Sequence, residues 1–179
     1  MSRFSPLKKV ALTIATAVVA AGGMVALSPG AAHAASLFTV RLAPTSNLFL
    51  FVEVQGASTA STAPIDQWSY TGGKNQVWTF MPTGGYYEII NQNSGKCIMT
   101  DGTPGHQLIQ APCTGSRYQL WQVGNEWVKG DFTYDSAIRN PASGLCMDVY
   151  GGSTTQGAAI DAWYNNGASA NQCFRAYPL

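Results

Sequence analysis

The chain has 179 residues, of which 46% are hydrophobic and 11% charged, and its formal net charge is +1. It contains no basic run and no basic amphipathic stretch, so neither a nucleic acid nor a membrane surface is expected as its partner. The sequence instead predicts a sparsely charged folded protein.

The first 34 residues are typical of a secretory signal peptide. Residues 1–9 carry three basic side chains, residues 10–27 are apolar and uncharged, and a small-x-small cleavage site ends at Ala34. The alternative is a membrane anchor, but an 18-residue apolar stretch is at the short limit for spanning a bilayer. We therefore expect cleavage after Ala34, an extracellular mature chain, and no membrane insertion of that mature form.

The mature chain, residues 35–179, has 145 residues, which is enough for one domain with a hydrophobic core. Three of the ten Lys and Arg residues leave with the signal peptide, so seven remain against nine Asp and Glu, a net charge of −2. A mildly acidic domain with few charges is not suited to binding a phosphate backbone.

All four cysteines lie in the mature chain, at Cys97, Cys113, Cys146 and Cys173. Export to an oxidising compartment favours disulfides, and four cysteines allow three pairings between which sequence alone does not choose. A zinc site is the alternative. It would lack a Cys-x-x-Cys pair and would have His106 as its one histidine, so we expect no metal and no cofactor.

Two segments of the mature chain are copies of each other. Residues 53–68 align without a gap with residues 148–163, and eight of the sixteen positions are identical, which chance does not produce. The match continues after one inserted residue, where Asn75-Gln76-Val77-Trp78 meets Asn171-Gln172-Cys173-Phe174.

A third copy lies between them. Tyr118-Gln119-Leu120-Trp121 repeats the Gln-x-Trp pattern, and residues 91–97 match residues 140–146. The chain therefore divides into three repeats, at about 36–85, 86–132 and 133–179.

The segments of each repeat are typical of strands. Residues 49–54, 76–80 and 86–90 are rich in β-branched and aromatic side chains, and Gly, Ser, Asn and Pro cluster between such segments. No stretch after residue 35 has a sustained 3.6-residue apolar period. The mature chain is therefore predicted to be all-β, with short strands and many turns.

These motifs resemble the ricin B-type lectin family, also called the QxW repeat family. Its sugar-binding repeats contain Cys-x-Asp, a Gly-Gly-Ser-Thr loop, an x-Trp platform and Asn-Gln-x-Trp in that order, and the resemblance covers the whole mature chain. It implies a β-trefoil of three four-stranded repeats, with a six-stranded barrel capped by three hairpins. The core aromatics would be Trp78, Trp121 and Phe174.

The resemblance places the main sugar site in the third repeat. A sugar needs a flat aromatic ring for its C–H face and a short carboxylate that accepts hydrogen bonds from its hydroxyls. Asp148 would be that carboxylate, Trp163 the platform, Asn171 a further hydroxyl partner and Gln172 the support of Asp148. Asp161 stands where the family often has Gln.

The first repeat keeps a weaker version of this set, comprising Glu53, Asp66, Trp68, Asn75 and Gln76. Its carboxylate is Glu instead of Asp, and the extra methylene shifts the acceptor. The middle repeat has Met99 and Ala111 at the carboxylate and platform positions, and Tyr118 before its Gln. We predict no sugar site there.

Each of these residues also has an ordinary structural explanation. Trp68 and Trp163 could be core residues, but Trp78 and Trp121 already fill that role. Asp148 could cap a turn. The Gln of the motif recurs in the middle repeat, which favours a structural role for Gln119 at least, and packing is the expected role of Trp127.

By the same resemblance, Cys97 and Cys113 occupy the two positions that pair within a repeat. The first repeat has Phe51 and Tyr70 there, so an aromatic contact could replace the bond. The third has Cys146 but Asn165 at the partner position. Cys173 is left over, so we expect a Cys146–Cys173 bridge, with two free thiols or pairing between molecules as the alternatives.

The sequence favours binding over catalysis. The mature chain has one histidine and no apparent nucleophile–base pair, so an enzyme is not expected. We predict a secreted lectin-like protein that recognises galactose-like or pentose residues of glycans or polysaccharides, chiefly through the third repeat. It would act alone or with a non-covalent protein partner. The alternative is a secreted β-trefoil protease inhibitor or a scaffold that binds proteins instead of sugars.

Overall fold

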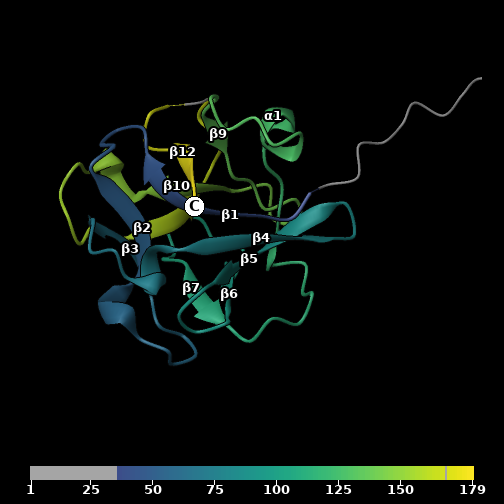
Figure 1. Cartoon of the computed structure of the whole chain (residues 1–179), viewed down its shortest axis with the longest axis horizontal. Coiled ribbons are helices and arrows are strands. Elements are labelled where there is room, and N and C mark those ends of the chain that lie inside the picture. Colours follow the sequence, from purple (N-terminus) through teal and green to yellow (C-terminus); the bar gives the residue numbers. More distant parts are fainter. Residues whose placement is uncertain (1–35, 168) are drawn as a thin grey trace, which may run out of the picture. The chain divides into compact units, whose positions relative to one another are not determined.

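The described part of the chain contains twelve β-strands, whose arrangement is shown in Figure 1. The computed structural model describes residues 36–167 and 169–179. The predicted signal peptide, residues 1–34, lies outside these residues. The strands fall into three successive groups of four: β1 (Phe38–Pro44), β2 (Leu50–Val54), β3 (Ile65–Ser69) and β4 (Trp78–Thr83); β5 (Tyr86–Asn91), β6 (Cys97–Met99), β7 (Ile109–Ala111) and β8 (Leu120–Trp121); β9 (Ser136–Ala137), β10 (Cys146–Val149), β11 (Ile160–Trp163) and β12 (Cys173–Pro178).

Helical structure in the described residues is short. It comprises α1 (Asn125–Val128) and the 3₁₀ turns η1 (Gln55–Ala57), η2 (Lys74–Gln76) and η3 (Tyr150–Gly152). None of these helices has the length and apolar character needed to cross a bilayer. The strands predicted at 49–54, 76–80 and 86–90 are present as β2, β4 and β5 with slightly shifted ends.

The first and last strands of the three groups close into a six-stranded barrel. β1 pairs with β4 and β12, β4 with β5, β5 with β8, and β12 with β9, all antiparallel. The ring closes between the ends of β8 and β9, where Gln122 N donates to Arg139 O (2.7 Å) and Arg139 N donates to Gln122 O (2.9 Å). Closure leaves the barrel without a free edge.

The second and third strands of each group form hairpins: β2–β3, β6–β7 and β10–β11. The three hairpins also contact one another, through the bridges Pro64↔Ile109, Gln107↔Asp161 and Asp66↔Ala159. A closed six-stranded barrel with three hairpins is the predicted β-trefoil, so the all-β, β-trefoil prediction is confirmed.

One aromatic side chain from each group fills the core. Trp78, Trp121 and Phe174 are fully buried, as predicted. The indole N–H of Trp78 donates to Val52 O (2.9 Å) and that of Trp121 to Ile98 O (3.1 Å), so both buried donors are satisfied. Trp127 is also fully buried, which confirms packing as its role.

The glutamine two residues before each core aromatic fixes a loop. Its side-chain oxygen accepts from a backbone N–H, and its amide donates to a backbone carbonyl, at the end of the third strand and in the loop that follows. In the first repeat, Thr71 N donates to Gln76 (2.9 Å) and Gln76 donates to Ser69 O (2.8 Å). In the second, Thr114 N donates to Gln119 (2.9 Å) and Gln119 donates to Pro112 O (2.8 Å). In the third, Asn166 N donates to Gln172 (3.0 Å) and Gln172 donates to Tyr164 O (2.8 Å). The structural role predicted for Gln119 is therefore confirmed.

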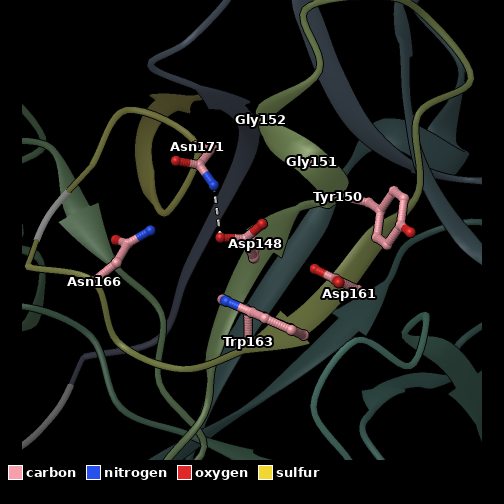
Figure 2. A pocket seen from close by; sticks show the side chains of 8 residues that line it. All are labelled: Asp148, Tyr150, Gly151, Gly152, Asp161, Trp163, Asn166 and Asn171. Atoms are coloured by element: carbon pink, nitrogen blue, oxygen red, sulfur yellow. Dashed lines mark hydrogen bonds between the residues drawn. The ribbon is translucent and has the colours of Figure 1, made fainter.

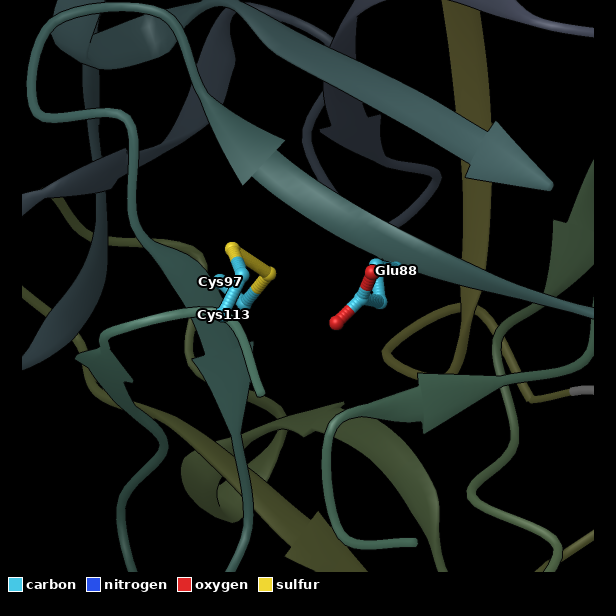
Figure 3. Close-up of side chains that lie close together, drawn as sticks. All are labelled: Glu88, Cys97 and Cys113. Carbon is cyan, nitrogen blue, oxygen red and sulfur yellow. A yellow bond between two sulfur atoms is a disulfide. The ribbon is translucent and has the colours of Figure 1, made fainter. Parts of the chain in front are cut away.

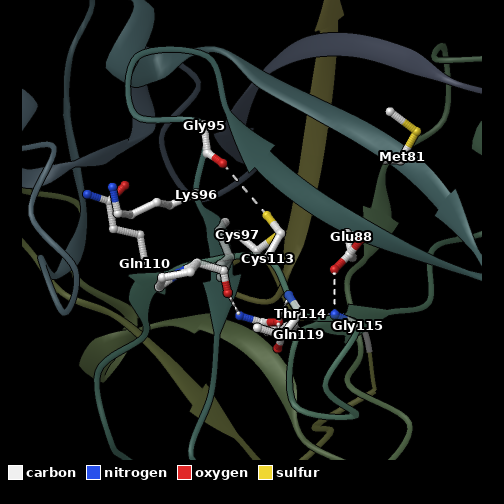
Figure 4. The surroundings of a disulfide bond; sticks show 12 residues. Met81, Glu88, Gly95, Lys96, Cys97, Gln110, Cys113, Thr114, Gly115 and Gln119 are labelled. Atoms are coloured by element: carbon white, nitrogen blue, oxygen red, sulfur yellow. Dashed lines mark hydrogen bonds between the residues drawn. A yellow bond between two sulfur atoms is a disulfide. The ribbon is translucent and has the colours of Figure 1, made fainter.

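Cys97 and Cys113 form the predicted disulfide, with their Cα atoms 5.1 Å apart (Figure 3). Glu88 lies close to both sulfurs, but the bonded sulfurs have no thiolate to offer a metal ion. Its carboxylate instead accepts from Gly115 N (3.0 Å) in the loop that follows Cys113 (Figure 4).

The other two groups of strands have different residues at the positions equivalent to Cys97 and Cys113. In the first, Phe51 and Tyr70 make an edge-to-face contact with ring centroids 5.6 Å apart, so the expected aromatic replacement is present. In the third, the predicted Cys146–Cys173 bridge is wrong, because both residues are free thiols. Cys146 lies on β10, the second strand of its group, and pairs with Trp163 across the hairpin. Cys173 lies on β12, opposite Ala137 of β9 in the barrel.

Thiol counting tests this arrangement. In protein unfolded without reductant, we expect two thiols per chain to react with a thiol reagent, and four after reduction. A count of zero before reduction would contradict the structure and restore the second bridge.

Candidate functional site

A cavity of about 370 Å³ opens beside the third hairpin (Figure 2). Two carboxylates, two amides, two aromatic rings and two glycines line it: Asp148 and Asp161, Asn166 and Asn171, Tyr150 and Trp163, Gly151 and Gly152. The structure therefore brings together four of the five residues predicted for this site. The fifth, Gln172, is buried in its loop contacts and does not line the cavity.

The pairing of β10 with β11 sets the positions of the main side chains. Asp148 lies directly opposite Asp161, and Trp163 lies opposite Cys146 two residues away. Because alternate residues of a strand point to the same face, Asp148, Asp161 and Trp163 share the face away from Met147 and Ala162, which are in the core.

A tight 3₁₀ turn, η3, forms the upper rim of the cavity after β10. Gly151 and Gly152 have φ angles of 64° and 65°, in the left-handed region that favours glycine. The turn allows Tyr150 to project beside Asp161, as Figure 2 shows.

Asp148 is held in place by a hydrogen bond. The Asn171 amide donates to its Oδ2 (2.7 Å). The second carboxylate differs, because Asp161 Oδ1 has no hydrogen-bond partner among the described residues although it is buried. The cavity therefore contains one fixed carboxylate oxygen and one unsatisfied one.

Burial of two facing carboxylates changes their proton affinity. Desolvation raises the pKa of Asp148 above its ordinary value, and the bonds from Gln172 and Asn171 oppose this rise. Desolvation, and next the charge of Asp148, raise the pKa of Asp161 to about 7. Near neutral pH Asp161 is therefore partly protonated beside Asp148.

A second cavity, of about 550 Å³, lies beside the first hairpin. Its eight residues occupy the positions equivalent to those of the third-repeat cavity: Glu53, Gln55, Gly56, Ala57, Asp66, Trp68, Thr71 and Asn75. The pairing of β2 with β3 places Glu53 opposite Asp66, as Asp148 lies opposite Asp161. Of the residues predicted here, only Gln76 is outside the lining.

The two cavities differ in how their carboxylates are bound. The longer side chain of Glu53 reaches Gln76, whose amide donates to its Oε2 (2.8 Å). Desolvation, and next the charge of Glu53, raise the pKa of Asp66 to about 6. Gln55 donates to Asp66 Oδ2 (3.3 Å), and this bond opposes the rise. Tyr150 takes the place of Gln55 in the third repeat, so Asp161 lacks this donor.

The middle hairpin has no carboxylate pair. Met99 lies opposite Ile109, and Ala111 lies opposite Cys97. Asp101 and His106 form an exposed pair there, with Oδ2 and Nδ1 2.7 Å apart. Neither a buried carboxylate nor an aromatic platform is present at the equivalent positions, and the absence of a sugar site in this repeat stays a prediction.

The two tryptophans predicted as platforms are at the surface. Trp163 is 43% exposed and Trp68 is 38% exposed, so the alternative of a core position is wrong for both. Each ring lies against a glycine of a neighbouring repeat. A Cβ on Gly105 would lie 3.0 Å from Trp163, and one on Gly157 would lie 3.4 Å from Trp68.

Sequence reasoning missed some of the lining residues. Tyr150 and Asn166 in the third repeat, and Gln55 and Thr71 in the first, were not predicted for these sites. Tyr150 and Gln55 differ in type, so the comparison of repeats gave no signal for them. The feature that could have indicated them is that Gln55 and Tyr150 both come directly before a glycine of the aligned loop, Gly56 or Gly151.

Comparison with known proteins agrees with this geometry. The chain matches the family described as "Ricin-type beta-trefoil lectin domain-like" over residues 30–111, 75–163 and 117–176. It therefore belongs to the ricin-type beta-trefoil lectin-like family, and this membership supports carbohydrate binding in general. No curated protein matches the chain.

Solved structures give the same result. The designed threefold-symmetric protein ThreeFoil is 28% identical over 79% of this chain and 99% of its own, with a TM-score of 0.69. An exo-beta-1,3-galactanase from Clostridium thermocellum is 26% identical over 79% of this chain, with a TM-score of 0.70, and this chain spans 30% of its length. The C-half of the earthworm R-type lectin in complex with GalNAc is 18% identical over 79% of this chain and 99% of its own, with a TM-score of 0.63, and is evidence for the fold alone.

The Asp161 carboxyl generates a prediction about stability and pH. Its pKa is about 7 in the folded chain, against 3.8 as the ordinary value, so between these values the folded state keeps a proton that the unfolded state loses. Its stabilising contribution is therefore present at low pH and is lost as pH rises to about 7. Because Asn has no such proton, the stability of Asp161→Asn relative to wild type should increase with pH across this window.

Urea unfolding of wild type and Asp161→Asn at intervals from about pH 4 to about pH 8 covers the interval between the two pKa values. It measures the difference in the free energy of unfolding between the two proteins. Asp66→Asn is the matched control, since its pKa of about 6 predicts the same trend ending at lower pH. A difference between Asp161→Asn and wild type that does not vary with pH would contradict the prediction.

Gly105 generates a second prediction. Gly105 and Gly157 both have a φ of 79°, so an alanine at either position bears a similar left-handed strain of about 1–2 kcal/mol. Only Gly105→Ala also pushes its Cβ into tight contact with a tryptophan, at 3.0 Å instead of 3.4 Å. We expect Gly105→Ala to lower the free energy of unfolding in urea more than Gly157→Ala does. Equal losses would show that the contact with Trp163 contributes nothing.

Proposed function

We propose that this protein is a secreted carbohydrate-binding protein that recognises galactose-like or pentose residues of glycans or polysaccharides, chiefly through the third-repeat cavity. The proposal is carried by one observation. The exposed indole of Trp163 and the Asn171-bound carboxylate of Asp148 line the same cavity.

This combination suits a sugar. The indole offers a flat surface to the C–H face of the ring, and the ionised carboxylate accepts hydrogen bonds from neighbouring hydroxyls. Asp161 adds a second oxygen which, when protonated, donates to a hydroxyl. A cavity of about 370 Å³ is in the size range of small-ligand sites.

The first-repeat cavity is proposed as a secondary site. Glu53 Oε2 accepts from the buried amide of Gln76, as Asp148 Oδ2 accepts from Asn171, but the extra methylene of Glu53 shifts its carboxylate relative to that of Asp148. Trp68 still supplies the platform. We therefore expect weaker binding of a single sugar there than in the third repeat.

Galactose is the first sugar to test, because a galactanase is among the more similar solved structures. The Cys97–Cys113 disulfide supports an extracellular location. Carboxylates, amides and aromatic rings line the third-repeat cavity, which suits the binding of a sugar.

Trp163→Ala and Asp148→Asn test the assignment. We expect each to lower the affinity of the third-repeat site about tenfold or more, because each removes either the stacking surface or a charge-assisted hydrogen bond. A glycan array with the wild-type protein first selects the sugar among galactose, xylose and arabinose. Isothermal titration calorimetry with that sugar then measures the loss of affinity in each variant. Far-UV circular dichroism, which reports the backbone, should remain unchanged.

Met99→Leu is the matched control, because Met99 occupies the position of Asp148 in the middle hairpin, and this variant should bind as wild type does. Wild-type affinity in both test variants would refute the assigned site. Inhibition of a protease panel without any glycan signal would favour the inhibitor alternative instead.

A further inference from the structure

An aromatic cluster lies beside the first hairpin, outside the cavity already described. It surrounds a depression of about 340 Å³, and we call it the aromatic shelf: Arg41, Leu48, Phe49, Phe51, Tyr70 and Tyr177. Phe49 is 85% exposed and Tyr70 is 58% exposed. Contiguous exposed apolar surface of this kind commonly marks a binding site.

Three rings of the shelf, Phe51, Tyr70 and Tyr177, are held by contacts with one another or with Arg41. Phe51 packs edge-to-face against Tyr70 and against Tyr177, with centroids 5.6 and 5.8 Å apart. The Arg41 guanidinium lies over the Tyr70 ring, 5.1 Å from its centroid. Side chains ordered before a ligand arrives lose less conformational freedom when it binds.

The shelf continues the first-repeat cavity. Phe51 lies directly opposite Trp68 on the paired strands, and the next pair on the same face is Glu53 with Asp66. Side chains directly opposite each other in such a pair have Cβ atoms about 5 Å apart. Tyr70 is followed in the chain by Thr71, which lines the cavity. One edge of the cavity is therefore the start of the shelf.

The trefoil fold does not require these aromatics. The positions of Phe49, Phe51 and Tyr70 are filled in the middle repeat by Gly95, Cys97 and Cys113, and in the third by Gly144, Cys146 and Asn165. Both of those repeats fold with small side chains at the three positions. Phe51 and Tyr70 pack together where the middle repeat has its disulfide, but the third repeat has neither, so the fold alone does not account for the three rings.

We propose that the aromatic shelf and the first-repeat cavity form one elongated site for an uncharged oligosaccharide, with one sugar in the cavity and the following sugars over the shelf. This inference rests on the proposed function. Aromatic rings bind the C–H faces of successive sugars. The Arg41 guanidinium lies over Tyr70 and lines the depression, so it supplies N–H donors for sugar hydroxyls at the shelf. Glu53 and Asp66 at the cavity end disfavour an anionic chain.

The experiment compares sugars of increasing length. Asp148→Asn, which weakens the third-repeat site, is the parent. It is titrated calorimetrically with β-1,3-linked galactose oligomers and β-1,4-linked xylose oligomers of one to four units. We expect the affinity of the parent to rise about tenfold from monomer to tetramer in the series that binds. Adding Phe49→Ala and Tyr70→Ala should abolish that rise and leave the affinity for the monomer unchanged.

Tyr134→Ala is the matched control, because Tyr134 has the same 58% exposure as Tyr70 and lines neither cavity. It should keep the full dependence on length. The same dependence in the shelf variant, or no dependence in the parent, would overturn the elongated site and leave the proposed function standing. No binding of any sugar by the protein with both sites intact would overturn both.

Discussion

The buried amide of the glutamine in each Gln-x-Trp or Gln-x-Phe motif is the interaction on which the rest of this structure depends. It joins the loop after the third strand to a chain segment whose aromatic residue, two positions later, lies in the core. A buried amide must satisfy its own hydrogen bonds, so the loop is held to the barrel and does not move independently. In the first and third repeats, this loop carries Thr71 or Asn166 into the cavity. The middle repeat keeps the same bonds without the cavity residues, so the glutamine belongs to the fold and the sites are built on it.

The carboxylate pairs are a different case, because they oppose stability. Strand register alone makes Asp148 and Asp161, or Glu53 and Asp66, direct neighbours, and burial makes their charges unfavourable. The middle hairpin fills the same two positions with Met99 and Ile109 and pairs in the same register. The hairpin therefore needs no acid there, so the fold does not account for the two pairs that line the cavities, and we propose that they serve binding. Departures from local stability are expected at functional sites.

The all-β class and the three repeats followed from the sequence pattern, whereas the β-trefoil arrangement followed from the resemblance to the ricin B-type lectin family. The ungapped match of residues 53–68 with 148–163 placed equivalent side chains in equivalent positions, and Trp78 and Trp121 in the core left Trp68 and Trp163 for the surface.

The second disulfide was predicted wrongly because pairing leftover cysteines ignores which strand carries each one. Cys146 is on a hairpin strand and Cys173 on a barrel strand. The shelf was not predicted either. From the sequence, Phe51 and Tyr70 were interpreted only as a substitute for a disulfide. Arg41 on β1 and Tyr177 on β12 contact these two rings because of the three-dimensional arrangement of the strands, which the sequence does not show.

The two cavities are therefore not equal copies. In the third repeat, Asp148 is short, is bound by Asn171, and faces a turn that bears Tyr150, so the cavity is compact and its acceptor is available. In the first repeat, Glu53 extends back to Gln76, and the cavity is larger and continues onto the shelf. One site is thus suited to a single sugar and the other to a stretch of chain. On a polysaccharide that reaches both, the second binding event is intramolecular, so a weak first-repeat site still raises the overall affinity. Under the proposed function, the loss of symmetry between the repeats would give the protein two modes of contact with one polymer, which two identical sites would not provide.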